Sequence, residues 1–82
     1  MAVRWMPIRV MTAAGDPLRP TAFWWRRRRY RVDRVQEQWQ DAGAWWAGEA
    51  PRWFFRLEAE GGLYEVAADA DGRRWWMYRI FD

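Results

Sequence analysis

An alternation of apolar and polar residues in the C-terminal half, broken at Phe54 and divided by two short turn signals, limits the possible folds more than any other feature. From residue 52 to residue 60, apolar side chains occupy every second position, which is the period of a half-buried β-strand. Gly61-Gly62 follows directly, and Asp71-Gly72 follows a second apolar segment; both are typical of two-residue hairpin turns. The pattern predicts a three-stranded antiparallel meander over residues 52–81.

The two turns predict which residues face each other and which face is the core. The register places apolar side chains opposite one another, although it also sets Glu58 opposite Glu65, a like-charge pair that costs up to about 1 kcal/mol. The predicted pairs are Glu60 with Leu63, Ala59 with Tyr64, Leu57 with Val66, Phe55 with Ala68, Ala68 with Trp75, Val66 with Met77 and Asp69 with Arg74. The predicted core face carries Phe55, Leu57, Tyr64, Val66, Trp75 and Met77.

The N-terminal half also reads as short strands separated by turns. Residues 6–11 alternate, residues 14–17 form a turn cluster, and residues 21–25 are rich in aromatic and β-branched side chains. The apolar positions change phase after Val32, which predicts either a β-bulge near Asp33-Arg34 or a short helical turn after Val35. We therefore expect an all-β fold, a small antiparallel half-open barrel of five or six strands similar to SH3-like barrels, as a single domain over residues 1–82.

The second face of the meander is unusually apolar, because it carries Leu63, Trp76, Tyr78 and Ile80 in place of a polar surface. Either strands from residues 6–10 and 23–39 cover this face, or it is exposed and binds a partner. The predicted register places Arg56, Ala67 and Trp76 in one row, with a shallow depression over the small Ala67. The candidate partner-binding residues on this face are Phe54, Arg56, Trp76 and Tyr78.

Composition excludes most catalytic chemistry. The chain has no Cys, His, Ser, Lys or Asn, so thiol, serine and Schiff-base nucleophiles, histidine bases and zinc sites are all absent. Four carboxylates on one hairpin could hold a divalent metal, but alternate acidic residues on a strand are more often a solvated face. We expect no catalytic residue, no metal and no cofactor. The four carboxylates of this hairpin are Glu58, Glu60, Glu65 and Asp69.

Targeting signals are not evident in the sequence. The first residues contain no apolar run that could form the core of a signal peptide, and no stretch approaches the roughly 18 apolar residues of a membrane span. We expect a cytoplasmic protein that does not associate with membranes. The oligomeric state is not predictable from this pattern.

Basic residues concentrate in one segment, which also contains aromatic residues. Clustered guanidinium groups neutralise phosphates, and interleaved rings can stack on the bases of a single strand. Against this, a GC-rich genome would enrich arginine and tryptophan without any functional requirement, and the segment would then be a solvated hairpin loop. The candidate nucleic-acid-binding residues are Trp24, Trp25, Arg26, Arg27, Arg28, Arg29, Tyr30 and Arg31.

A pair of tryptophans, Trp45 and Trp46, lies in a glycine-rich connection. Tryptophan buries a large apolar area, so the pair could close one end of the barrel as a lid. If exposed, it would instead be an anchor for a protein partner.

Several motifs together resemble a small bacterial domain of unknown function. They are F-x-W and R-x-Y-x-V within residues 20–32, W-W-x-G-E over residues 45–49, and an aromatic-rich end over residues 75–82, so the similarity covers nearly the whole chain. This family occurs stand-alone or at the C-terminus of Y-family DNA polymerase-like proteins associated with mutagenesis. Where the family tends to have a turn glycine, this chain has Arg27, which favours a longer loop over a tight positive-φ turn.

The resemblance implies a role near DNA-damage tolerance without supplying a mechanism. Two hypotheses follow for this non-catalytic accessory module. It binds single-stranded DNA, or it docks onto a translesion polymerase or an associated mutagenesis protein. The two hypotheses predict a different dependence of affinity on salt concentration, because phosphate contacts weaken steeply with salt and apolar contacts do not.

Overall fold

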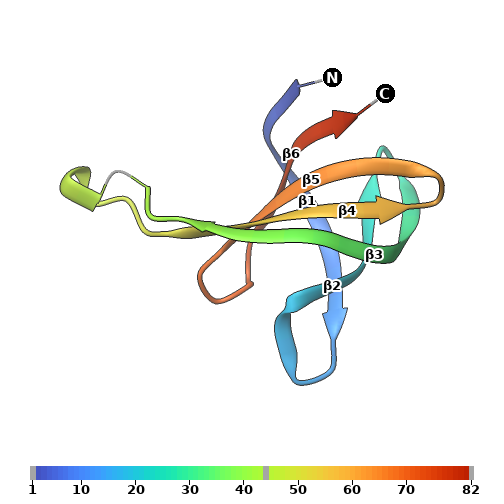
Figure 1. Ribbon diagram of the computed structural model, residues 1–82, viewed down its shortest axis with the longest axis horizontal. Coiled ribbons are helices and arrows are strands. Elements are labelled where there is room, and N and C mark those ends of the chain that lie inside the picture. The colour runs from blue at the N-terminus through green and yellow to red at the C-terminus, as the bar shows by residue number, and fades with distance from the viewer. Residues whose placement is uncertain (1, 44, 82) are drawn as a thin grey trace.

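The computed structural model describes the backbone of residues 2–43 and 45–81 and the side chains of residues 5–43 and 46–81. Within these residues the chain forms six antiparallel strands in sequential order, and β1 pairs with β6 to close a barrel (Figure 1). A short 3₁₀ helix, η1 (Trp45–Ala47), lies between β3 and β4. The strands are β1 (Ala2–Ala13), β2 (Asp16–Trp25), β3 (Arg28–Asp41), β4 (Arg52–Ala59), β5 (Gly62–Asp69) and β6 (Trp75–Phe81).

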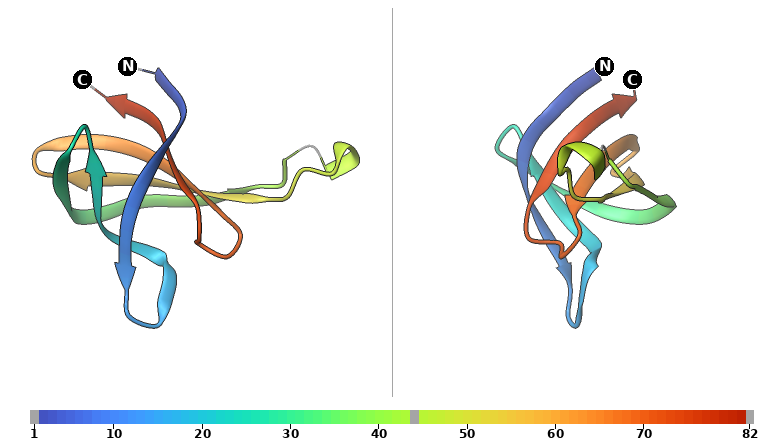
Figure 2. Two further views of the ribbon diagram at one scale, coloured as in Figure 1. Left: turned by 180° about the vertical axis from the view of Figure 1, so that it is seen from behind. Right: turned by 90° about the vertical axis from the view of Figure 1, so that its left-hand side faces the viewer.

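The all-β class and the small antiparallel barrel predicted from the sequence are confirmed. The ring of strand pairs is complete rather than half-open, because β1 joins β6 through pairs such as Met6 with Met77 and Ile8 with Trp75. The two ends of the described chain consequently lie side by side (Figure 2). Closure removes the free edges that β1 and β6 would otherwise expose.

The barrel interior contains the apolar face that the alternation predicted. Phe55, Leu57, Val66 and Met77 are almost completely buried, Trp75 is buried, and Tyr64 packs partly buried against them. The other half of the barrel contributes Phe23, from the aromatic-rich segment of residues 21–25, to the same core. With no disulfide in a chain without cysteine, burial of these side chains supplies the main stabilisation.

The predicted register of the β4–β5 hairpin is wrong. The turn is formed by Glu60 and Gly61, both with positive φ, and Ala59 pairs with Gly62. As a result Leu57 faces Tyr64 and Phe55 faces Val66, whereas the sequence predicted Val66 and Ala68 as their partners. The same residues still face the core, because both registers preserve the alternation.

The predicted register of the β5–β6 hairpin is confirmed. Ala68 pairs with Trp75 and Val66 with Met77. The loop around Asp71 and Gly72 is wider than two residues, since the amide of Asp69 bonds the carbonyl of Arg74 at 3.1 Å. Asp69 and Arg74 therefore flank the loop, as predicted.

β3 is the long strand of the barrel, and bulges interrupt it. Val32 pairs with Ala59 and Arg34 with Glu58, so Asp33 is an extra residue on this strand. This confirms the bulge predicted near Asp33-Arg34, and no helical turn follows Val35. A second irregularity separates Val35 from Glu37.

β2 and β3 diverge soon after their turn. They share a ladder only from Ala22–Arg31 to Trp25–Arg28, whereas β3 stays paired with β4 as far as Asp41. The first half of β2 bends away with β1 (Figure 1). An open cleft of about 800 Å³ separates it from β3, and Phe55 lies among the residues that line the cleft.

Candidate functional site

The basic segment forms a tight hairpin turn. Arg26 and Arg27 are its two central residues, with φ of 51° and 67°, and Trp25 pairs with Arg28. The longer loop that the missing glycine suggested is therefore wrong. Two arginines adopt the left-handed conformation that this turn requires, although glycine and asparagine adopt it at lower cost.

The outer face of the β1–β2–β3 sheet brings together cations and one indole. Arg9, Trp24 and Arg29 lie in one row across the three strands. The Arg9 guanidinium carbon lies 4.3 Å from the centroid of the Trp24 ring. Arg31 lies beside Ala22 in the next row. We define the basic strip as these four charged or aromatic residues together with the turn: Arg9, Trp24, Arg29, Arg31, Arg26 and Arg27.

Three of the predicted nucleic-acid-binding residues lie elsewhere. Trp25 packs against the core, and the Tyr30 ring stacks on Phe23 at 5.2 Å between centroids. Arg28 lies over the Tyr30 ring, and its Nη2 is 2.8 Å from Oε1 of Glu60. These three side chains therefore stabilise the end of the barrel, and the outward positions of the segment carry the accessible charge.

No side chain of the basic strip forms an ion pair within the part of the chain that the structure describes, although the backbone amide of Arg31 donates a hydrogen bond to Oε2 of Glu60 at 2.9 Å. The arginines that form ion pairs there are Arg28, Arg34, Arg56 and Arg73. Arg9 was not among the predicted residues, because its position beside Trp24 depends on the β1–β2 register. A signal was present: Ile8 and Val10 point inward, so Arg9 between them points outward.

The second face of the meander carries an aromatic cluster whose members pack against one another. The corrected register sets Phe54, not Arg56, in a row with Ala67 and Trp76, so the predicted depression between a guanidinium and an indole is wrong. Phe54 is only 6% exposed because rings from neighbouring strands surround it. We define the outer aromatic cluster as Trp5, Trp39, Phe54, Trp76 and Tyr78.

Strands from the N-terminal half contribute to this cluster as neighbours rather than as a covering layer. Trp5 of β1 lies 5.9 Å from Phe54 and 5.3 Å from Tyr78, between ring centroids. Trp39 of β3 stacks on Phe54 at 5.5 Å. The Arg52 guanidinium lies 4.9 Å from the Trp5 ring, so a cation covers part of the cluster.

Ile80 was predicted to lie on the second face of the meander, and this prediction is wrong. Val66 pairs with Met77 and Glu65 with Arg79, so Tyr78 is an extra residue in β6. This bulge reverses the alternation, and Ile80 is buried in the core.

A row of charges lies beside the outer aromatic cluster. Arg56 donates hydrogen bonds from Nε and Nη2 to one carboxylate oxygen of Glu65, at 3.1 and 2.9 Å, and Nη1 lies 3.6 Å from Glu37. The hydrogen bond to Glu65 raises the pKa of Arg56, against the opposing effect of burial. Arg56 is thus engaged within the protein and is poorly placed to contact a partner.

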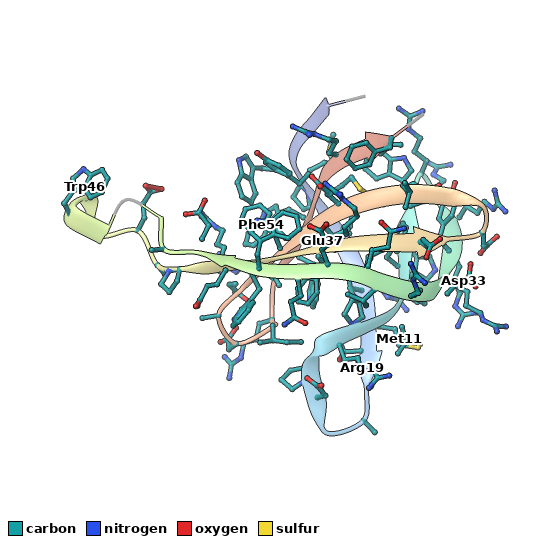
Figure 3. The ribbon with its side chains drawn as sticks, viewed as in Figure 1. Met11, Arg19, Asp33, Glu37, Trp46 and Phe54 are labelled. Carbon is teal, nitrogen blue, oxygen red and sulfur yellow. The ribbon has the colours of Figure 1, made fainter. Side chains whose placement is uncertain are left out.

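The β3–β4 hairpin extends beyond the barrel as an arm (Figure 1). Its end carries η1, where the Trp46 side chain is 74% exposed, far from the barrel (Figure 3). The Trp45 side chain lies outside the described residues. The lid interpretation is therefore wrong, because this connection projects away from the barrel. A pocket of about 310 Å³ at the base of the arm is lined by Trp5, Asp41, Gly43, Glu49, Arg52 and Phe54.

The four carboxylates of the predicted acidic group each have a separate partner. Glu58 pairs with Arg34 at 2.9 Å, and Glu60 and Glu65 pair with the arginines described above. Burial acts to raise the pKa of Asp69, but hydrogen bonds from the amides of Arg74 and Arg73 outweigh it and lower that pKa. Among the described residues, no three potential ligands gather to hold a metal ion.

Comparison with known proteins provides the family. In the part of the chain that the structure describes, no helix is long and apolar enough to cross a membrane. Searches of curated proteins and of solved structures produced no match. A family model, the domain of unknown function DUF6504, matches residues 2–82. The chain therefore belongs to the DUF6504 family.

Proposed function

We propose that this domain is a non-catalytic accessory module that binds single-stranded DNA through the basic strip. The observation that carries the proposal is the row of Arg9, Trp24 and Arg29 across three strands, with no described carboxylate paired to it. Guanidinium groups on both sides of an indole suit a strand whose phosphates and bases are both accessible.

The geometry favours a single strand over a duplex. The guanidinium carbon of Arg9 lies over the Trp24 ring, 4.3 Å from its centroid, and an unpaired base can stack beside this pair. Bases within a duplex have no free face for such stacking. The family resemblance further suggests that this binding serves DNA-damage tolerance in the cytoplasm.

A salt-dependent titration tests the proposal. A fluorescent single-stranded oligonucleotide of about 15 nucleotides is titrated with the protein at about 50 and 200 mM salt and read by anisotropy. Each lost phosphate contact lowers the slope of log affinity against log salt by about 0.7. The variant Arg29→Gln/Arg31→Gln should therefore flatten the slope by about 1.4 units.

The matched control is Arg34→Gln/Arg73→Gln, which removes the same charge away from the basic strip. Arg34 pairs with Glu58, and Arg73 lies beside Asp71. This variant should keep the wild-type slope. Equal losses in the two double variants, or no binding at the lower salt, would refute the proposed site.

A second function is favoured by one observation, the exposure of Trp46 at the end of the arm. An exposed tryptophan on a projecting element is a suitable anchor for a protein partner. The partner that the resemblance suggests is a Y-family polymerase-like protein or an associated mutagenesis protein. Binding of the purified polymerase-like protein should be lost in Trp46→Ala and should change little between about 50 and 200 mM salt. Binding unaffected by Trp46→Ala would exclude the arm as the docking element.

A further inference from the structure

β3 pairs with β2 and with β4 over successive stretches rather than along its whole length. From Val32 to Asp41 it pairs with β4, but its ladder with β2 ends at Arg31. Over residues 32–41 no described strand lies on the side that faces β2. This edge runs along the cleft and continues into the arm, with Asp33 and Glu37 on β3 (Figure 3).

The hairpin geometry identifies which backbone groups point to the open side. Glu60 and Gly61 form a two-residue turn, so the flanking pair Ala59–Gly62 exchanges hydrogen bonds, and bonded pairs alternate from there. In β4, the backbone groups of odd-numbered residues therefore form hydrogen bonds with β5, and those of even-numbered residues form hydrogen bonds with β3. Phe54 bonds with Trp39, whereas the amides and carbonyls of Gln38 and Gln40 point away from β4 to the open edge.

The two walls of the cleft differ in how well they could accept a strand. Pro17 and Pro20 remove backbone donors from β2, which is a common way to protect an edge. β3 has no proline. Its bulges at Asp33 and Gln36 disturb the first part of the edge, but Glu37–Asp41 pairs with β4 without interruption. The regular acceptor edge is therefore residues 37–41.

The outward side chains of this edge have a definite chemical pattern. They are acidic, aromatic and acidic: Glu37, Trp39 and Asp41. On the β4 side they face a basic, aromatic and basic series: Arg56, Phe54 and Arg52. The Glu37–Arg56 atoms lie 3.6 Å apart, and the Trp39 and Phe54 rings stack at 5.5 Å. The side chains of β4 thus show which sequence pattern complements this face of β3.

We propose that the edge Glu37–Asp41 binds an extended peptide by β-strand addition. The peptide carries a basic–x–aromatic–x–basic pattern, so its side chains complement the three outward residues of β3 as those of β4 do. Its backbone bonds the free amides and carbonyls of Gln38 and Gln40. In an antiparallel addition Glu37, Trp39 and Asp41 form non-hydrogen-bonded pairs with residues of the peptide. The Cα atoms are closest in such pairs, so the side-chain contacts are strongest there. This site is separate from the basic strip.

The probe is a synthetic peptide, acetyl-Gly-Arg-Thr-Phe-Thr-Arg-Gly-amide, added to the full chain. Binding should slow amide hydrogen exchange at Gln38 and Gln40 while the basic strip is unaffected. A peptide with both arginines replaced by glutamate should bind about tenfold more weakly, because it would meet Glu37 and Asp41 with like charges.

The edge variant is Gln38→Pro, which removes one donor on the open side and leaves the β4 ladder intact. It should weaken peptide binding about tenfold, since a backbone hydrogen bond is lost and the edge is blocked. Gln38→Thr is the matched control and should bind as the wild type does. Circular dichroism verifies that both variants fold.

Three results would overturn the proposal. They are the absence of protection at Gln38 and Gln40 with saturating peptide, equal binding by Gln38→Pro and Gln38→Thr, and a dimer in solution that already protects these amides without peptide. The last would assign the edge to a second copy of the chain.

Discussion

Glu65 lies 3% exposed on the outer face of the sheet, although it is a carboxylate. It is tolerated there because Arg56 directly opposite donates two hydrogen bonds to it. The sequence pattern predicted a turn at Gly61-Gly62, whereas the turn lies one residue earlier, and both positions keep the same residues in the core. The observed turn replaces a repulsive Glu58–Glu65 pair with an attractive one, so electrostatics on the outer face distinguishes the two registers.

A double-mutant cycle tests this pair at the residue scale. Arg56→Met should lower the urea midpoint more than Glu65→Leu does, because it leaves a buried carboxylate without its main partner. The double variant should be more stable than Arg56→Met alone. Equal midpoints for Arg56→Met and the double variant would mean that Glu65 finds compensation elsewhere.

Gly72 shows a requirement that composition alone does not reveal. It has a φ of 74°, and a β-carbon there would lie 2.2 Å from the carbonyl oxygen of Pro17. Gly15 has a similar φ of 79° but open space around it. The β5–β6 loop thus packs against the start of β2 at a point where only glycine fits.

The two glycines form a matched pair of variants. Gly15→Ala should cost about 1 kcal/mol of unfolding free energy, the penalty for a left-handed L-residue. Gly72→Ala should cost at least about 2 kcal/mol, since the clash with backbone adds to that penalty. Urea denaturation measures both. Similar losses would show that the loop can move away from Pro17.

At the scale of elements, the β2–β3 hairpin contains a local conflict. Arg26 and Arg27 both have positive φ, a conformation that arginine does not intrinsically favour. A longer loop was predicted for this reason. The Arg26 guanidinium lies 5.5 Å from the Trp25 ring centroid. Pairing of the flanking strands, with Phe23 and Tyr30 in the core, holds the tight turn despite its cost.

Relieving that conflict should stabilise the protein. Arg27→Gly should raise the free energy of unfolding by about 1 kcal/mol, which corresponds to about 4–8 °C in Tm for a domain of this size. Arg29→Gly is the control and should lower Tm, because Arg29 lies in an extended strand where glycine is unfavourable. A lower Tm for Arg27→Gly would indicate that the arginine side chain itself supports the turn.

At the scale of the whole molecule, the outer aromatic cluster and Trp46 of the arm differ in their surroundings. Members of the outer aromatic cluster come from β1, β3, β4 and β6 and hold these strands together from outside the barrel. Trp46 belongs to the arm and lies apart from the barrel. The outer aromatic cluster serves stability, whereas Trp46, at 74% exposure, is expected to contribute little to it.

This difference gives a stability test. Phe54→Ala should cost about 3–5 kcal/mol, as for a well-packed core phenylalanine. Trp46→Ala should change the unfolding free energy by less than about 0.5 kcal/mol, as for a surface position. Thermal and urea unfolding measure both variants. A large loss in Trp46→Ala would show that the arm packs on the barrel in solution.

Sequence pattern was enough to predict the β class, the positions of the two C-terminal hairpins and most of the core, but not the register of the β4–β5 hairpin. These features depend on periodicity and turn residues, which act over a few neighbouring positions. The tertiary structure decided the rest: the closure of β1 on β6, the meeting of Arg9 with Trp24, the position of Ile80 and the open edge of β3. Such contacts join residues far apart in the chain, and bulges change the register between them, so local pattern cannot specify them.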